Sequence, residues 1–225
     1  MQEGISLVMS EDGSHTLFHK GLQEHYHSIH GAIQESKHIF IEAGFRFAES
    51  SNNHINVLEI GFGTGLNAML TCLAAMETSL QVYYHGIEAF PLKAPVWSSL
   101  NYDIRLNSSM AKSVFGEIHG SEWNIINKLL PGFTLLKTAS RLQEVQLQTS
   151  YYNLVYFDAF SPEVQPEMWT GEIFARISDS LVTGGILVTY CCKGIVKRAL
   201  KSAGFLIEKL PGPPGKREIL RAVKK

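Results

Sequence analysis

Residues 59–67 of this 225-residue chain read EIGFGTGLN, and this stretch decides the fold. The residues just before the first glycine, INVLEI at 55–60, form an apolar run that predicts a buried strand. The residues after the last glycine, 66–76, predict a helix. Glycines between a strand and a helix let the backbone turn sharply and approach a ligand without a Cβ atom in the way. The stretch therefore predicts a nucleoside-binding loop in a protein of the α/β class.

Two kinds of nucleoside use such a loop, and the glycine spacing separates them. A dinucleotide site follows G-x-G-x-x-G, but Leu66 stands where that pattern needs its third glycine. Glu59, just before the turn, would repel a pyrophosphate, whereas its charge suits the cationic amino group of a methionine moiety. The loop resembles motif I of class I S-adenosylmethionine-dependent methyltransferases.

The next two predicted strands differ in the residues at their carboxyl ends. Residues 81–88 (QVYYHGIE) predict a second strand that ends at Glu88, and a carboxylate at this point can bind ribose hydroxyls of either kind of nucleoside. Residues 133–138 (FTLLKT) predict a third strand. Class I methyltransferases usually place an Asp after it to bind adenine, but residues 138–141 read TASR. The adenine contact is thus unassigned, with Ser140 or a backbone carbonyl as candidates.

The fourth predicted strand, 152–158, ends at an acid and continues as DAFSP over 158–162. Open α/β sheets bind ligands at such carboxyl ends. An amine that attacks a methyl carbon must be neutral and in line with the leaving group, within about 3 Å. The Asp158 carboxylate can accept one amine hydrogen and so aim the lone pair, and can take the proton afterwards. Phe160 would form a dry wall of the pocket, and Pro162 would stiffen the loop.

The remaining pattern completes the fold class. We expect the Rossmann-like α/β fold of class I methyltransferases, with a seven-stranded, mostly parallel sheet and a small N-terminal cap. Residues 1–50 are expected to form the cap or lid, irregular until a helix near 31–48, and residues 51–225 the methyltransferase domain. Further strands are predicted at 184–190, 205–210 and 218–223, and helices at 168–181, 195–203 and around 121–130.

Four ordered motifs carry a more specific resemblance, which spans roughly residues 10–220. The chain resembles the methyltransferase half of the bifunctional tRNA 5-methylaminomethyl-2-thiouridine biosynthesis enzymes (MnmC), and in particular the stand-alone MnmD type. The similar stretches are DGSHT at 12–16 with HYHSIHGAIQES at 25–36, EIGFGTGLN at 59–67, DAFSP at 158–162 with PEMW at 166–169, and KRE at 216–218.

The resemblance implies methylation of the 5-aminomethyl amine on the wobble uridine of tRNA, with the anticodon region as partner and S-adenosylmethionine as cofactor. It implies cofactor contacts at Glu59, Gly61, Phe62, Gly63, Thr64, Gly65, Asn67, Glu88 and Asp158, with Asp158 also catalytic. Pocket positions would be Tyr26, Ser28, Glu35, Phe160, Pro162 and Trp169. The family's fused form adds a flavin-dependent oxidase, which we expect this chain to lack, so no flavin is expected.

Charge is distributed unevenly along the chain. Ten of the 20 Lys and Arg residues, but only two of the 21 Asp and Glu residues, lie in 193–225. Clustered basic residues can bind phosphates. Lys193, Lys216 and Arg217 are therefore candidate tRNA contacts, although a solvated helix face with a basic terminus explains the same pattern.

Several other classes are disfavoured. No apolar stretch reaches about 18 residues, the first residues lack a signal-peptide pattern, and three cysteines make no disulfide framework, so we expect a cytoplasmic protein. His25, His27 and His30 lack a regular metal spacing, so no metal is expected.

A class I methyltransferase for a small-molecule or protein amine stays open as an alternative function. Leu66 argues against a nicotinamide-dependent oxidoreductase, and Asp158 argues against a non-catalytic adaptor. The oligomeric state is open.

Overall fold

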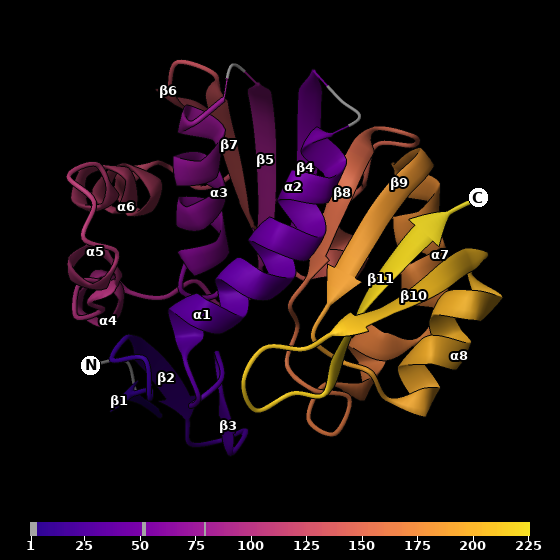
Figure 1. The fold of residues 1–225 in the computed structure, drawn as a ribbon, viewed down its shortest axis with the longest axis horizontal. Coiled ribbons are helices and arrows are strands. Elements are labelled where there is room, and N and C mark those ends of the chain that lie inside the picture. The colour runs from indigo at the N-terminus through magenta and orange to yellow at the C-terminus, as the bar shows by residue number, and fades with distance from the viewer. Residues whose placement is uncertain (1–3, 51–52, 79) are drawn as a thin grey trace.

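A computed structural model describes residues 4–50, 53–78 and 80–225, and its centre is an eight-stranded sheet (Figure 1). The strand order is β10-β11-β9-β8-β4-β5-β7-β6. Five neighbouring strands are parallel: β9 (Leu181–Thr189), β8 (Tyr152–Phe157), β4 (His54–Ile60), β5 (Gln81–Glu88) and β7 (Phe133–Ala139). The antiparallel strands are β10 (Phe205–Pro211) and β11 (Glu218–Lys224) at one edge and β6 (Ile126–Leu130) at the other.

Helices cover both faces of the sheet, which explains why nearly all residues of its central strands β4 and β8 are buried. One face carries α3 (Leu66–Met76), α6 (Ala111–Gly120) and a long helix made of α1 (Ala32–Ser36), the π-helical η1 (Lys37–Phe45) and α2 (Arg46–Glu49). The other face carries α7 (Gly171–Ser180) and α8 (Gly194–Ser202). Shorter helices are α4 (Ala94–Trp97), α5 (Tyr102–Arg105), η2 (Leu142–Glu144) and η3 (Pro166–Trp169).

The sheet has eight strands rather than the predicted seven, because the stretch predicted as a helix around 121–130 contains β6. The helix before it, α6, ends at Gly120. The apolar residues of the stretch, Ile125, Ile126, Leu129 and Leu130, have the three-to-four spacing of a helix face. Antiparallel pairing of β6 with β7 overrides that local pattern.

The N-terminal region is more regular than predicted. Residues expected to be irregular form a three-stranded antiparallel sheet of β1 (Ile5–Met9), β2 (His15–His19) and β3 (Glu24–His25). This small sheet lies across the carboxyl ends of the parallel strands (Figure 1). The helix over 32–49, in contrast, shares a hydrophobic core with α3 and the main sheet.

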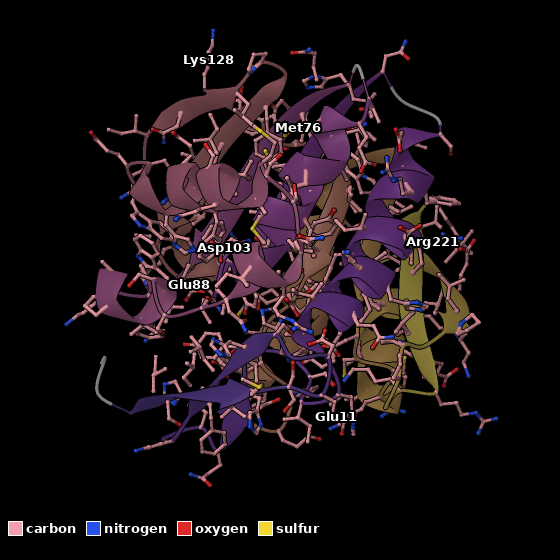
Figure 2. The ribbon with its side chains drawn as sticks, turned by 60° about the vertical axis from the view of Figure 1, so that its left-hand side comes forward. Glu11, Met76, Glu88, Asp103, Lys128 and Arg221 are labelled. Carbon is pink, nitrogen blue, oxygen red and sulfur yellow. The ribbon has the colours of Figure 1, made fainter. Side chains whose placement is uncertain are left out.

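The carboxyl ends of β4, β5, β7 and β8 meet beneath the three-stranded sheet. Figure 2 shows Glu88, the last residue of β5, on this side, whereas Met76 and Lys128 lie at the opposite end of the sheet. Parallel strands place the residues that follow them at one edge, so the glycine loop and Asp158 become neighbours here.

A buried histidine in the sheet makes folding stability depend on pH. The His85 ring nitrogens lie 2.7 Å from the Tyr152 hydroxyl and 2.9 Å from Thr138 Oγ1, and burial lowers the pKa of His85 to about 4. The unfolded chain, with a pKa near 6.5, takes up this proton first, so acid favours unfolding. Between pH 8 and pH 5 the free energy of unfolding should fall by about 2 kcal/mol more in the wild type than in His85→Gln. Denaturant unfolding at both pH values measures this, and parallel losses in the two proteins would refute the assignment.

Candidate active site

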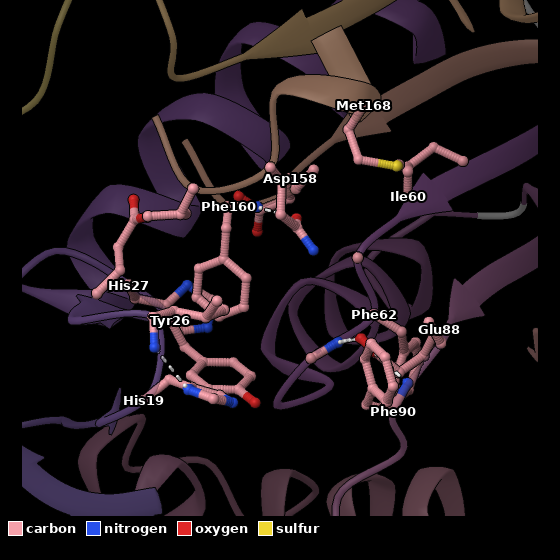
Figure 3. Close-up of a pocket in the computed structure, with 18 of the residues that line it drawn as sticks. His19, Tyr26, His27, Ile60, Phe62, Glu88, Phe90, Asp158, Phe160 and Met168 are labelled. Carbon is pink, nitrogen blue, oxygen red and sulfur yellow. Dashed lines mark hydrogen bonds between the residues drawn. The ribbon is translucent and has the colours of Figure 1, made fainter. Parts of the chain in front are cut away.

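A large cavity of about 690 Å³ lies between the strand ends and the three-stranded sheet. Its floor comes from the ends of β4, β5 and β8, and its roof from β2, β3 and the chain that follows them. Figure 3 shows Glu88 and Phe90 on one side of the cavity and Phe160 and Tyr26 on the other, with Asp158 between them. Asp158, Phe160 and Glu88 come from loops that the sequence predicted to converge.

The glycine loop is held by close backbone contacts at Gly61, and a residue with a Cβ atom would not fit there. Gly61 has a φ of +87°, and a Cβ built there would lie 2.5 Å from the Asp158 carbonyl oxygen. The amides of Gly61 and Phe62 both donate to the Ile87 carbonyl at 3.1 Å. The loop therefore joins the ends of β4, β5 and β8 and leaves its backbone close to the cavity.

Glu88 is held in the cavity by backbone donors. Its Oε2 accepts the Gly63 amide hydrogen at 2.9 Å, and its Oε1 accepts that of Phe90 at 2.9 Å. Burial raises the pKa of Glu88, while the backbone donors oppose that shift. Each oxygen retains a lone pair, so the carboxylate can accept two further hydrogen bonds, as a pair of hydroxyl groups would provide.

Asp158 is the acidic group at the floor of the cavity, and a buried network orients it. Asn67 Nδ2 donates to Asp158 Oδ2 at 2.9 Å and to Glu59 Oε1 at 2.9 Å. Burial and the nearby Glu35 carboxylate raise the pKa of Asp158 to about 8, against the opposing effects of Asn67 and Lys216. A carboxyl group with such a pKa can exchange a proton near neutral pH.

The roof of the cavity contacts the loop that follows β8 through aromatic rings and hydrogen bonds. The Tyr26 and Phe160 rings meet edge to face with centroids 5.0 Å apart. Glu24 accepts hydrogen bonds from the Ser161 amide at 3.2 Å and the Ser161 hydroxyl at 3.0 Å. These contacts close one side of the cavity with aromatic rings.

A partly buried ion pair completes the wall. Glu35, 8% exposed, lies 3.1 Å through Oε1 from Lys216 Nζ, and its Oε2 accepts the Ser28 amide hydrogen at 2.8 Å. Lys216 also lies over the Tyr190 ring, 5.1 Å from its centroid. Lys216, predicted as a tRNA contact, thus points into the cavity.

Comparison with known proteins identifies the kind of domain. Residues 134–225 match a family described as S-adenosyl-L-methionine-dependent methyltransferase. The chain is 32% identical over 213 residues to the tRNA 5-methylaminomethyl-2-thiouridine biosynthesis bifunctional protein MnmC of Magnetococcus marinus, and 29% identical over 206 residues to that of Pseudomonas fluorescens. These matches cover 88% and 87% of this chain but 31% of each relative, so the chain spans about a third of their length.

A solved structure agrees with the sequence relatives. The crystal structure of MNMC2 from Aquifex aeolicus aligns with 100% of this chain and 71% of its own, with a TM-score of 0.80 and 25% identity. This chain carries an S-adenosyl-L-methionine-dependent methyltransferase domain. A spermidine synthase complexed with the transition-state analogue AdoDATO aligns with a TM-score of 0.56 at 11% identity, which reflects the shared fold alone. The predicted fold class is confirmed, with eight strands in place of seven.

The cavity of the methyltransferase domain fits its cofactor in chemical character. Glu88 offers two acceptors to hydroxyl groups, and the backbone of Gly61 and Gly63 is open to the cavity. Apolar side chains, which suit a flat heterocycle, line the same space: Ile60, Ile87, Phe90, Leu142 and Met168. Ser140, the candidate adenine contact, also lines it.

Some predicted site residues lie outside the cavity lining of the methyltransferase domain. Four members of the predicted cofactor set, Glu59, Thr64, Gly65 and Asn67, are buried and do not line the cavity, and Pro162 is partly buried outside the lining. Glu59 is 0% exposed, and burial raises its pKa well above the ordinary value. Of the predicted set, Gly61, Phe62, Gly63, Glu88, Asp158, Tyr26, Ser28, Glu35 and Phe160 line the cavity.

Trp169 was predicted in the substrate pocket, and the structure places it elsewhere. It is 2% exposed within the core beneath α7, and its Nε1 donates to the Phe160 carbonyl at 2.8 Å. Its amphipathic ring fits a core site with one hydrogen-bond acceptor, so it supports the pocket wall from behind.

The basic residues also differ in their surroundings. Lys193 forms an ion pair with Glu163, which offsets its charge, whereas Arg217 is exposed beside the cavity-facing Lys216.

Two residues at the roof were not predicted as site residues. His27 is buried, its Nε2 lies 2.8 Å from Thr64 Oγ1, and burial lowers its pKa to about 4. It therefore links the roof to the glycine loop as a neutral side chain. Glu24, which holds Ser161, was also not predicted.

Membrane-spanning and metal-binding features are both missing from the part of the chain that the structure describes. Across residues 4–50, 53–78 and 80–225, no helix is long and apolar enough to cross a membrane. The same residues contain no group of three or more His, Cys, Asp or Glu side chains that could hold a metal ion.

Proposed function

We propose that the chain transfers a methyl group from S-adenosylmethionine to the amine of 5-aminomethyl(-2-thio)uridine at the tRNA wobble position, giving 5-methylaminomethyl(-2-thio)uridine. The observation that carries the proposal is Asp158, a carboxyl group that Asn67 orients in the cavity of a methyltransferase domain. The names of the MnmC relatives supply the substrate class. A tRNA substrate places the reaction in the cytoplasm.

In this proposal the cofactor lies across the ends of β4 and β5. Glu88 binds the ribose hydroxyls, and the backbone at Gly61 and Gly63 approaches the rest of the molecule. When bound, S-adenosylmethionine supplies a methyl group activated by a sulfonium sulfur. The buried residues behind the loop, including Asn67, act by holding Asp158 and the loop in place.

In this proposal Asp158 orients the substrate amine and accepts its proton. Its carboxylate accepts one amine hydrogen, which aims the nitrogen lone pair, and it takes the proton that the product ammonium releases. Phe160 and Tyr26 form an aromatic wall on which a splayed uracil can stack, as single-stranded bases do on aromatic side chains. Of the predicted cap, residues 1–50, the part from β1 to Glu35 acts as the lid in this scheme, because Tyr26, Ser28 and Glu35 line the cavity, whereas the helix over 32–49 packs in the core.

The tRNA backbone is proposed to follow the basic C-terminal segment. Arg217 is the strongest candidate contact, because it is exposed and adjacent in sequence to a residue of the cavity wall. Lys193 is a weaker candidate, because its ion pair with Glu163 would have to open first.

A direct assay tests the proposal. Purified protein with methyl-labelled S-adenosylmethionine should label tRNA from a strain that lacks this gene, and nucleoside mass spectrometry should find the label in 5-methylaminomethyl(-2-thio)uridine. tRNA whose wobble uridine lacks the aminomethyl group should stay unlabelled. S-adenosylhomocysteine, but not NAD, should raise the melting temperature by a few degrees. Label in small amines but none in tRNA would overturn the substrate and favour a small-molecule methyltransferase.

A further inference from the structure

The loop over 212–217, between β10 and β11, carries Lys216 to the cavity in a fixed position. Within the loop, the Gly212 amide donates to the Arg217 carbonyl at 3.1 Å, and the Lys216 amide donates to the Pro213 carbonyl at 2.9 Å. His38 Nε2 lies 2.8 Å from the Pro211 carbonyl, which ties the start of the loop to η1. The Lys216 side chain is therefore anchored to the wall rather than free in solvent.

The groups around Lys216 form an uneven set of charges. Among the described residues, the titratable groups that line this part of the cavity are Glu35 from α1, Glu24 from β3, Tyr26 and His27 after β3, Asp158 after β8, Tyr190 after β9, and Lys216 itself, while Cys191 is buried behind the wall. Three of these groups are carboxyls, whereas Lys216 supplies an ammonium. Its 3.1 Å contact with Glu35 offsets one negative charge close to Asp158, whose pKa Glu35 raises and Lys216 lowers.

Charge in this wall matters because only a neutral amine is a nucleophile. Two unpaired carboxylates would stabilise the ammonium form of an amine substrate and raise its pKa, whereas an ammonium group nearby lowers it. In a partly buried cavity such effects are larger than in water.

We propose that Lys216 is a positioning residue that keeps the substrate amine neutral by offsetting Glu35, and is not primarily a phosphate contact. This inference rests on the proposed amine methylation for its reaction step. In that step the neutral nitrogen forms the new N–C bond, the C–S bond breaks with its electron pair passing to sulfur, and the surplus proton leaves the nitrogen for Asp158.

The first test is a binding measurement that needs no tRNA. Sinefungin has a carbon with an attached amine in place of the methylated sulfur of S-adenosylmethionine. S-adenosylhomocysteine has a neutral sulfur and no amine at that position. Calorimetry at pH 7 gives the ratio of their Kd values. In Lys216→Met the ratio should shift by about tenfold in favour of sinefungin, because the cavity becomes more negative. The double variant Glu35→Gln/Lys216→Met should return to within about twofold of the wild-type ratio. Lys201→Met, on the exposed side of α8, is the matched control and should leave the ratio unchanged.

The second test is the pH profile of single-turnover methyl transfer to tRNA. Lys216→Met should move the midpoint up by about one pH unit, lower the rate at pH 7 about tenfold and regain it near pH 9. The double variant should restore the wild-type midpoint.

The outcomes separate the two proposals. Equal changes in both Kd values, or a double variant as defective as Lys216→Met, would overturn the role of Lys216 in favour of a purely structural or phosphate contact. A shifted Kd ratio with no methylation of tRNA by the wild type would overturn the tRNA substrate and retain the charge role for an amine.

Discussion

Asp158→Ala is expected to lower the single-turnover rate of methyl transfer by about 10²–10⁴-fold, the range typical of losing a positioned acid–base group. Asp158 lies at the floor of the cavity and is oriented by Asn67, whereas Glu35 in the same wall is paired with Lys216 and Glu24 accepts hydrogen bonds from Ser161. Rapid-quench measurement of labelled methyl transfer under saturating tRNA gives the rate.

Binding controls distinguish chemistry from folding in this variant. The Kd of S-adenosylhomocysteine should change less than about threefold, because Glu88 and the glycine loop are intact. Asp103→Ala, which removes a carboxylate on α5 that does not line the cavity, should retain the wild-type rate. A fully active Asp158→Ala protein would remove Asp158 from the mechanism.

Gly61→Ala should abolish most cofactor binding, with a loss of at least about tenfold in the affinity for S-adenosylhomocysteine. The new Cβ would lie 2.5 Å from the Asp158 carbonyl oxygen, a backbone atom, at a φ of +87° that alanine adopts poorly. The loop must shift away from the β8 end, so we also expect a loss of about 2 kcal/mol or more in stability.

A second glycine provides the control for this prediction. Gly116 lies on the exposed side of α6, and a Cβ built there meets nothing within 4 Å. Gly116→Ala should stabilise the protein by about 0.5–1 kcal/mol and leave cofactor affinity unchanged. Calorimetry and denaturant unfolding of both variants test the pair, and wild-type affinity in Gly61→Ala would contradict the packing argument.

The central sheet and the converging loops were predictable because their signals are local. The run at 55–60, the glycines after it, and the acids at 88 and 158 each mark the carboxyl end of a strand, and parallel topology brings such ends together. The strand pattern therefore placed Asp158, Glu88 and Gly61 at one edge of the sheet, and the family resemblance supplied their expected roles.

The predictions were wrong where tertiary contacts, and not the local sequence pattern, determine the structure. The 125–130 stretch has a helical spacing, and only pairing with β7 makes it a strand. The strands of the N-terminal sheet are short and contain polar residues, so their pattern is weak. Trp169 is an aromatic residue of the kind that stacks on bases, but its neighbours bury it in the core.

Charge clustering could not reveal which of the basic residues faces the cavity. Lys216 and Arg217 are adjacent in sequence, yet one contacts Glu35 in the cavity wall and the other is exposed. The β10–β11 loop makes that difference, and loop direction depends on contacts with residues 30–38, far away in sequence.

A crystal structure of the protein with S-adenosylhomocysteine tests the central claim most directly. We predict the nucleoside across the carboxyl ends of β4 and β5, with its ribose hydroxyls on Glu88 and its sulfur facing Asp158. A nucleoside bound elsewhere, or an Asp158 carboxylate turned away from the sulfur, would contradict the proposed mechanism.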